Sequence, residues 1–215
     1  MTTAANIAER IKRLLESLVE PALAPFLVDW PRNTIHRSVA GCSLPVLRWL
    51  PDIAGDNRAF GSDLVAAVCD AAPSLAWRQT YTADDLDEVF LDNYGWSEIS
   101  GSNGPLVSQR IAYGFLLLGP STLYPHHRHE AEEIYLPLSG TASWQQRDGI
   151  WRDRPPGTPI HHVSDEPHAM RTGSAPLLAL YLWRGGDLAQ KARLDLNERC
   201  NSSSVGTLYD ATHPT

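Results

Sequence analysis

The chain has 215 residues, enough for one full domain or for a smaller domain with an extension. Hydrophobic residues make up 43% of it and charged residues 20%, which excludes general disorder. Its longest nearly apolar stretch, residues 111–120, is shorter than the roughly 20 residues of a membrane-spanning helix. The net charge is −7 and no Lys/Arg cluster stands out, which argues against nucleic acid and anionic membranes as partners.

An amphipathic helix is expected near the N-terminus, because apolar residues recur there at spacings of three and four. Two prolines, Pro21 and Pro25, end the pattern. The apolar stripe consists of Ile7, Ile11, Leu14, Leu15, Leu18 and Val19. We expect helical periodicity to continue, with interruptions, to about residue 100.

Two further helices are predicted in this N-terminal part. One covers residues 62–71 and stops before Pro73. The other opens at Thr82, whose hydroxyl can cap free amides while Asp85 answers three residues later, as in a capping box. Its expected apolar face is Leu86, Val89 and Phe90. Residues 28–55 are rich in Pro and Gly and are predicted to be irregular.

After Gly101 the pattern changes to short strands rich in branched and aromatic residues. Asp148 and Gly149 are expected to form a hairpin turn, with Gly149 supplying a positive φ. So many short strands predict a mainly β architecture, an antiparallel barrel or sandwich. The expected strands are residues 111–119, 133–139, 141–146, 161–164 and 177–183.

These patterns divide the chain into three parts. Residues 1–100 form a helical extension that packs on the barrel, residues 101–195 form the barrel, and residues 196–215 form a C-terminal tail.

The three cysteines are odd in number and scattered, without a CxxC pair, which is typical of reduced thiols. The first 18 residues carry charges throughout and lack the apolar core of a signal peptide. We therefore expect a cytoplasmic protein. The cysteines are Cys42, Cys69 and Cys200.

The histidines point to a metal site, since six of the eight lie between residues 126 and 168. His127 and His129 are two residues apart, so on a strand both side chains project from one face. Glu133 and Tyr135 share a face in the same way. Two imidazoles and a carboxylate are a common ligand set for Zn²⁺, Fe²⁺, Mn²⁺ or Ni²⁺.

Other readings of this stretch stay open. A solvated, His-rich hairpin is the structural alternative, although the nearby carboxylate and the strand-like flanks favour metal binding. Glu130 and Glu132 are rival carboxylates, but strand alternation favours Glu133. His126 has the opposite parity to its neighbours and is expected to be exposed or to lie behind the ligands.

The spacing His127-x-His129-xxx-Glu133-xxxxxx-Gly140 resembles the first cupin motif at every defined position. The resemblance implies a cupin fold, a double-stranded β-helix or jelly-roll barrel, here with a helical N-terminal extension. A second cupin motif normally supplies a Pro-Gly turn and one more His ligand. Pro156-Gly157 provides the turn, but the histidines that follow it do not match the simple spacing.

A longer pattern resembles the cupin-type dimethylsulfoniopropionate lyases of marine bacteria. It consists of Tyr124, the first motif and Tyr135, followed by PPGTPIHHVSDEPHAMRT and YLWRGG, and it covers roughly residues 105–190. The resemblance implies that His168 is the fourth metal ligand, whereas generic cupin spacing would select His161. We expect His161 and His162 to be buried histidines that donate to backbone carbonyls.

The resemblance also implies a reaction, the β-elimination of dimethylsulfoniopropionate to dimethyl sulfide and acrylate. The substrate is a small zwitterion whose carboxylate binds one divalent transition metal, with zinc, iron, manganese, cobalt and nickel left open. Tyr135 is the expected general base. Tyr124 is expected to bind the substrate carboxylate or to assist proton transfer, and Trp183 is expected to contact the sulfonium.

Other aromatic residues are weaker candidates for this pocket. Trp30 and Trp96 lie in or beside loop-like stretches and are candidate lid residues. The remaining candidates for sulfonium contact are Tyr113, Phe115, Trp144 and Tyr181.

The same ligand set fits other functions. An iron-dependent dioxygenase acting on a small thiol or acid, a metal-dependent sugar isomerase and a non-catalytic ligand-binding cupin are the alternatives. Tyr124 and Tyr135 beside the ligands favour the lyase. The oligomeric state stays open, and a homodimer is one option because cupins often pair through barrel edges.

Overall fold

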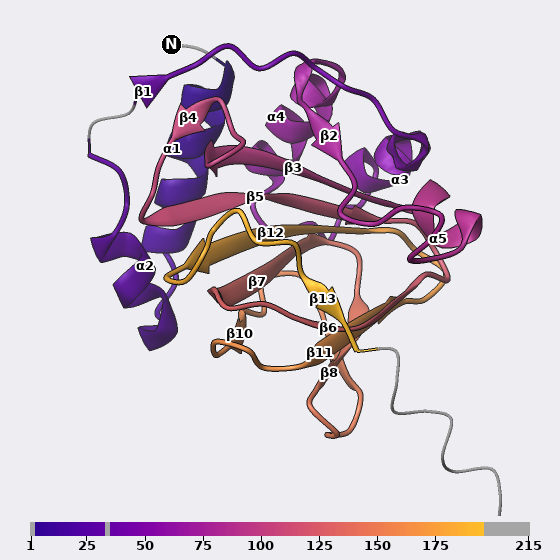
Figure 1. The fold of residues 1–215 in the computed structure, drawn as a ribbon. Coiled ribbons are helices and arrows are strands. Elements are labelled where there is room, and N and C mark those ends of the chain that lie inside the picture. The colour runs from indigo at the N-terminus through magenta and orange to yellow at the C-terminus, as the bar shows by residue number, and fades with distance from the viewer. Residues whose placement is uncertain (1–2, 33–34, 196–215) are drawn as a thin grey trace, which may run out of the picture.

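The computed structural model describes residues 3–32 and 35–195 of the chain (Figure 1). Its α-helices are α1 (Thr3–Glu16), α2 (Ala24–Val28), α3 (Leu50–Ala54), α4 (Ser62–Ala71) and α5 (Glu88–Asp92). Three short 3₁₀ helices join them, η1 (Pro21–Leu23), η2 (Pro45–Trp49) and η3 (Ala72–Ser74).

Two β-sheets form the barrel. The larger sheet has the strand order β1-β4-β3-β5-β12-β7-β10, and β2 pairs with β3 beside it. Its strands are β1 (Ile35–His36), β2 (Trp77–Arg78), β3 (Tyr94–Gly101), β4 (Leu106–Val107), β5 (Ile111–Leu118), β7 (Glu132–Ser139), β10 (Ile160–His162) and β12 (Leu177–Arg184).

The smaller sheet faces one side of the larger sheet and has the order β13-β6-β11-β8-β9 (Figure 1). Its strands are β6 (Leu123–Arg128), β8 (Ala142–Gln146), β9 (Arg152–Arg154), β11 (His168–Thr172) and β13 (Arg193–Leu194). A mainly β barrel with helices from the N-terminal part is therefore confirmed.

The central strands of the larger sheet are buried on both faces, because they lie between two cores. On β12, Leu178, Leu180 and Leu182 pack with the helices α1, α3 and α4. The alternate residues Ala179 and Tyr181 face the barrel interior. This explains why β5 and β12 read as nearly continuous apolar runs rather than as alternating strands.

The first helix is confirmed but ends earlier than its apolar stripe suggested. Ile7, Ile11 and Leu15 are fully buried in α1. The helix stops at Glu16, and Val19 beyond it is exposed. The second helix occupies the predicted residues as α4, and each of the five expected strands is present with ends shifted by one or two residues.

The predicted start of a helix at Thr82 was wrong. The Thr82 amide does donate to Asp85 Oδ2 at 2.9 Å, but these residues enclose a turn. Asp85 also pairs with Lys191 at 2.8 Å, and the helix α5 begins later, where Asp87 accepts a bond from the Phe90 amide at 2.7 Å. Asp87 is thus the N-cap, and Val89 faces solvent.

The prediction that helical structure continues to about residue 100 was also wrong, because residues 94–101 form the buried strand β3 between β4 and β5. In the β8–β9 hairpin, the Gly149 amide bonds to Gln146 O, and the positive φ belongs to Arg147 and not to Gly149. The residues predicted as irregular include β1, η2 and α3.

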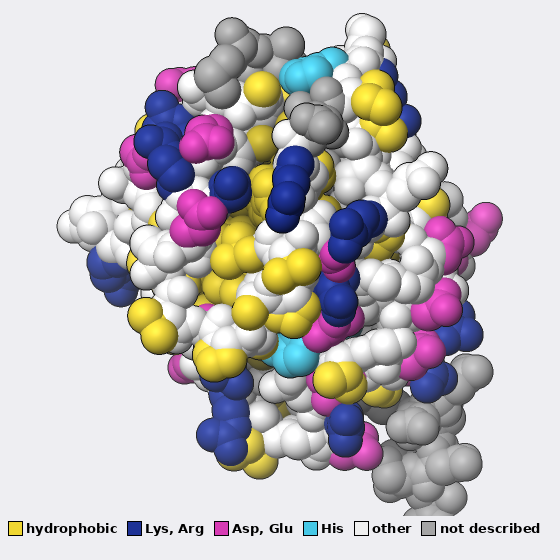
Figure 2. Space-filling model, turned by 90° about the vertical axis from the view of Figure 1, so that its left-hand side faces the viewer, with side chains coloured by type: hydrophobic (Ala, Val, Ile, Leu, Met, Phe, Trp, Pro, Cys, Tyr) yellow, Lys and Arg dark blue, Asp and Glu magenta, His cyan; other side chains and the backbone are white. Residues whose placement is uncertain are grey.

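The division at residue 100 stays a prediction, and the expected tail, residues 196–215, lies outside the described residues. Among the described helices, none is both long and apolar enough to cross a bilayer. On the face drawn in Figure 2, hydrophobic side chains gather in the centre, and charges of both signs are interspersed around them.

Candidate metal centre and its pocket

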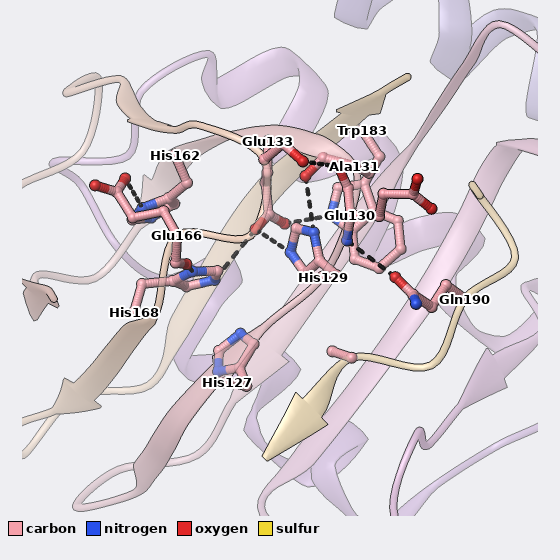
Figure 3. A network of polar contacts seen from close by, with 12 residues as sticks. His127, His129, Glu130, Ala131, Glu133, His162, Glu166, His168, Trp183 and Gln190 are labelled. Carbon is pink, nitrogen blue, oxygen red and sulfur yellow. Dashed lines mark hydrogen bonds and ion pairs between the residues drawn. The ribbon is translucent and has the colours of Figure 1, made fainter. Parts of the chain in front are cut away.

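Three predicted ligands meet in the barrel interior. His129 follows β6, Glu133 lies near the start of β7 and His168 opens β11. One ligand atom from each lies within 4.8 Å of the others, and all three side chains are buried. Figure 3 shows the two imidazoles converging on the Glu133 carboxylate. We call these residues and His127 the metal corner.

The ring orientation of the histidines is fixed by the backbone. Nδ1 of His127, His129 and His168 each lies 2.9 Å from a carbonyl oxygen. A carbonyl only accepts, so each Nδ1 carries the proton and donates it, which leaves the lone pair on Nε2. Histidine ligands in metal sites are oriented by the same kind of bond. The carbonyls belong to Pro125, Ala131 and Glu166.

The Nε2 atoms fit a cation. His129 Nε2 lies 2.9 Å from Glu133 Oε2, and His168 Nε2 lies 3.3 Å from the same oxygen without forming a hydrogen bond. A neutral imidazole with its proton on Nδ1 would point a lone pair at the carboxylate. Either a second proton on the ring or a cation among these atoms removes that repulsion. The donor set of two imidazoles and a carboxylate is one that divalent transition metals accept.

Neighbouring charges and burial shift the pKa of Glu133 in opposite directions. Burial alone would raise the pKa of its carboxyl, but the neighbouring His129 and His168 hold that pKa well below its usual range. Glu133 is therefore a carboxylate at neutral pH, as a metal ligand must be.

His127 lies beside this group rather than within it. Its ring centroid is 4.2 Å from that of His168 but 6.5 Å from that of His129, and Figure 3 shows it apart from the dashed contacts. Its other face stacks on Tyr124 at 3.9 Å. Burial, then the neighbouring His168, lowers the pKa of His127 well below its usual value, so the ring is neutral.

The rival carboxylates point away from the metal corner. Glu132 pairs with His161 at 2.8 Å and with Arg184 at 3.0 Å. Glu130 accepts a bond from the Asp187 amide at 3.2 Å on the exposed side of the barrel. Strand alternation thus separates both from the buried Glu133.

The remaining histidines have separate environments. His161 is half-buried and bonds to a carboxylate, which corrects the expected bond to a backbone carbonyl. His162 is buried as expected and stacks on His168 at 4.0 Å, but its Nδ1 lies near the side chains of Gln146 and Glu166, which corrects the expected bond to a backbone carbonyl. Burial lowers the pKa of His162 to about 4, with a further contribution from His168. His126 is half-buried, with Nε2 3.3 Å from the Arg147 carbonyl.

A cavity of about 210 Å³ opens beside the metal corner. His127 and Glu133 form part of its lining, and residues 188–192 close it from the side of the C-terminal segment. Most of the remaining wall is aromatic, from Tyr94, Trp96, Tyr124, Tyr135, Tyr181 and Trp183.

The two predicted tyrosines both line this cavity. Tyr135 is buried, with its ring centroid 6.2 Å from that of His168. Burial, then the charge of Glu133, raises the pKa of its phenol well above the usual value. Tyr124 is buried as well, and its hydroxyl lies 3.1 Å from that of Tyr81. Burial also raises the pKa of Tyr124 well above its usual value.

Trp183 lines the cavity and also holds Glu133, one of the predicted metal ligands, in place. Its indole Nε1 donates to Glu133 Oε1 at 2.6 Å, and its ring lies 4.1 Å from the ring of His129. This hydrogen bond leaves Glu133 Oε2 to face the imidazoles, so Trp183 orients the carboxylate.

Comparisons with known proteins identify the family of this chain. A family model for dimethylsulfoniopropionate (DMSP) lyases matches residues 30–179. The DMSP lyase DddQ of Ruegeria pomeroyi is 34% identical over 169 residues, which cover 77% of this chain and 82% of that protein. This chain belongs to the DMSP lyase family.

Solved structures of the same family show the same fold. The crystal structure of DddQ from Ruegeria pomeroyi superposes with a TM-score of 0.80 at 30% identity, covering 91% of this chain and 98% of that one. A chain from the crystal structures of the DMSP lyases RdDddP and RnDddQII gives 0.81 at 30% identity, covering 89% and 97%. The cupin barrel expected from the motif is thereby confirmed.

Several weaker predictions about the pocket were wrong. Tyr113 and Phe115 belong to the core against the helices, because their parity on β5 directs them away from the barrel interior. Trp30 stacks on Tyr113 at 4.3 Å and is absent from the cavity lining. Trp144 lies in the inner core, 5.8 Å from the ring of Tyr135. Trp96 does line the cavity, but from strand β3 and not from a loop.

Sequence reasoning missed most of one wall of this pocket and named only Trp96 from it, as a candidate lid residue. Tyr94, Trp96 and Glu98 line it from alternate positions of β3. That period of two is the signal that would have revealed them, had residues 94–101 been read as a strand. Residues 188–192 lie beyond the family match, and their sequence, LAQKA, carries no comparable pattern.

Proposed function

We propose that this protein is a metal-dependent lyase that cleaves dimethylsulfoniopropionate to dimethyl sulfide and acrylate. One observation carries the proposal: a buried His129, Glu133 and His168 group stands beside Tyr124 and Tyr135 in an aromatic pocket. Membership of the DMSP lyase family supplies the substrate class.

The metal corner is the proposed cofactor site, with His127 as fourth ligand beside the three converging residues. When bound, a divalent cation supplies Lewis acidity for the substrate carboxylate and positive charge that favours an ionised phenol nearby. Zinc, iron, manganese, cobalt and nickel all suit such a donor set, so the choice among them stays a prediction.

Tyr135 is the proposed general base. In the reaction its oxygen takes the proton from the carbon next to the substrate carboxylate. The electron pair of that C–H bond forms the C=C bond of acrylate, and the C–S bond breaks with its electron pair leaving on dimethyl sulfide. Burial and Glu133 raise the pKa of Tyr135, and the positive charge of a bound cation would oppose that shift and favour the ionised phenol that accepts the proton.

Tyr124 and the aromatic wall have supporting roles in this proposal. The Tyr124 hydroxyl, which is hydrogen-bonded to that of Tyr81, is proposed to hold the substrate carboxylate or to relay a proton. Ring faces attract a weakly hydrated sulfonium without needing an ion pair, so Tyr181 and Trp183 are proposed to receive that end of the substrate.

The test is to incubate purified protein with dimethylsulfoniopropionate and each candidate metal and to measure dimethyl sulfide in the headspace. We expect release with at least one metal and none after chelation. Absence of dimethyl sulfide with every metal would contradict the lyase. Oxygen uptake with a small thiol would then favour the dioxygenase. The cytoplasmic location and the homodimer stay predictions that this assay does not address.

A further inference from the structure

Glu98 is a second buried carboxylate in the pocket that the proposed chemistry does not use. It lies on β3, is buried, and lines the same cavity as Glu133. Arg37 and Arg78 act on it electrostatically, but no ion pair within 4.0 Å joins it to another described residue. A buried charge without an ion-pair partner is costly unless other groups compensate it.

One carboxylate oxygen of Glu98, Oε1, has a structural role. Its Oε1 accepts bonds from the amides of Asn103 at 2.5 Å and Gly104 at 2.7 Å, which hold the turn after β3. Both of these bonds fall on Oε1, so the turn does not require Oε2. Burial raises the pKa of Glu98 and the two amides oppose this, so the ionised carboxyl is incompletely compensated inside the protein.

The sheet register places Glu98 three strands away from the proposed general base, Tyr135. Glu98 pairs with Gly114 on β5, Gly114 with Tyr181 on β12, and Tyr181 with Tyr135 on β7. Neighbouring strands are about 4.8 Å apart, so the row spans about 14 Å along the sheet. Glu98 and Tyr135 thus stand at opposite ends of one row of inward-facing positions.

Gly114 keeps this row open. A Cβ at that position would lie 2.0 Å from the Ser97 carbonyl oxygen, so no side chain fits between Glu98 and Tyr181. The charge of Glu98 is felt across the gap, since it is the second cause, after burial, that raises the pKa of Tyr181.

The pocket therefore has two electrostatically different ends. At one end the metal corner is suited to a cation and hence to an anionic ligand group. At the other end Glu98 offers negative charge among ring faces. Lys191, which also lines the cavity, is already paired with Asp85 at 2.8 Å. A ligand with a carboxylate at one end and a fixed positive charge at the other matches this distribution.

We propose that Glu98 is a specificity-determining residue that receives the sulfonium end of the substrate and so selects a zwitterion over a neutral analogue of the same shape. This inference rests on the proposed function, because the sulfonium is that substrate's. Glu98 takes no part in proton transfer. Its effect is on binding, and it fixes which end of the ligand points at the metal corner.

The variant Glu98→Gln separates charge from structure. The amide oxygen of glutamine still accepts the two backbone bonds of the turn, while the negative charge is gone. A suitable uncharged ligand is 4-methylpentanoate, in which a CH group replaces the sulfonium sulfur of dimethylsulfoniopropionate. Glu9→Gln, on the exposed side of α1, is the matched control for loss of one charge.

We expect Glu98→Gln to raise KM for dimethylsulfoniopropionate about 10- to 100-fold, since one unscreened charge interaction is lost. We expect kcat to change less than about threefold and the inhibition constant of 4-methylpentanoate less than about twofold, because those rest on the metal corner. Glu9→Gln should behave as wild type. Thermal melting of each variant verifies that the fold is retained.

Two results would overturn the inference: an unchanged KM, or equal weakening of both ligands, which would make Glu98 only a support of the turn. Calorimetric titration of both ligands into metal-loaded protein gives the same comparison without turnover. If wild-type protein releases no dimethyl sulfide, the proposed function fails, and the ratio of the two affinities still decides the role of Glu98.

Discussion

The two sides of the pocket differ in how the chain builds them. The metal corner comes from β6, β7 and β11, with three of its four residues inside a seven-residue stretch, 127–133. The rest of the lining combines β3 with residues 188–192, which are about ninety positions away in the sequence. Chemistry is thus encoded locally, whereas the shape and charge that select a ligand arise from tertiary structure. Variants on the two sides should fail in different ways.

The largest expected effect is loss of the metal corner itself. His129→Ala should lower metal affinity by more than about 100-fold, since ligand loss exceeds the 10- to 100-fold effect of losing a residue that merely orients one. Elemental analysis after desalting measures this.

His168→Ala should lose more metal than His161→Ala, the half-buried control; the reverse order would transfer the ligand role to His161.

Tyr135→Phe tests whether turnover can be lost beside the metal corner while metal binding is retained. The variant should keep its metal but lose about 10²- to 10⁴-fold in kcat, because only the proton acceptor is removed. Headspace dimethyl sulfide and metal content are measured on the same sample. Turnover like that of wild type would remove Tyr135 as the base.

Trp183→Phe lies between the two sides, since Trp183 lines the pocket and also orients Glu133. Losing the 2.6 Å bond to Glu133 should weaken metal binding about 10- to 100-fold. The metal dissociation constant, from competition with a chelator, checks this. Unchanged affinity would show that packing alone holds the carboxylate in place.

The smallest effect is expected in the segment of residues 188–192. Lys191 lines the cavity and pairs with Asp85, and both side chains are partly exposed. Exposed ion pairs contribute about 0.2–1 kcal/mol, so Lys191→Ala should change KM by less than about fivefold with kcat intact. Steady-state kinetics decide; a loss of kcat would mean that this segment takes part in catalysis.

The sequence was most informative where backbone geometry translates directly into side-chain direction. Strand parity alone separated Glu133 from Glu130 and Glu132, and the structure places only the first of these in the barrel interior. The motif spacing likewise anticipated that His129 and Glu133 would meet.

The sequence was least informative where contacts with distant parts of the chain accompany the local structure. Asp85 sits in a sequence typical of a helix start, yet it lies in a turn and pairs with Lys191, more than a hundred residues away. The strand β3 is a different case, because its period of two is present in the sequence but residues 94–101 were interpreted as part of the helical region. Glu98 was missed for the same reason.

The placement of the central strands between two cores has a consequence for dissecting the molecule. Leu178, Leu180 and Leu182 cover the reverse side of the strand that carries Tyr181 and Trp183, and the helices are what shield them from water. A fragment truncated before residue 101 would strip that shield, at about 1.5–3 kcal/mol for each leucine. The N-terminal helices are therefore structural backing for the catalytic barrel, and the smallest autonomous unit of this enzyme must include them.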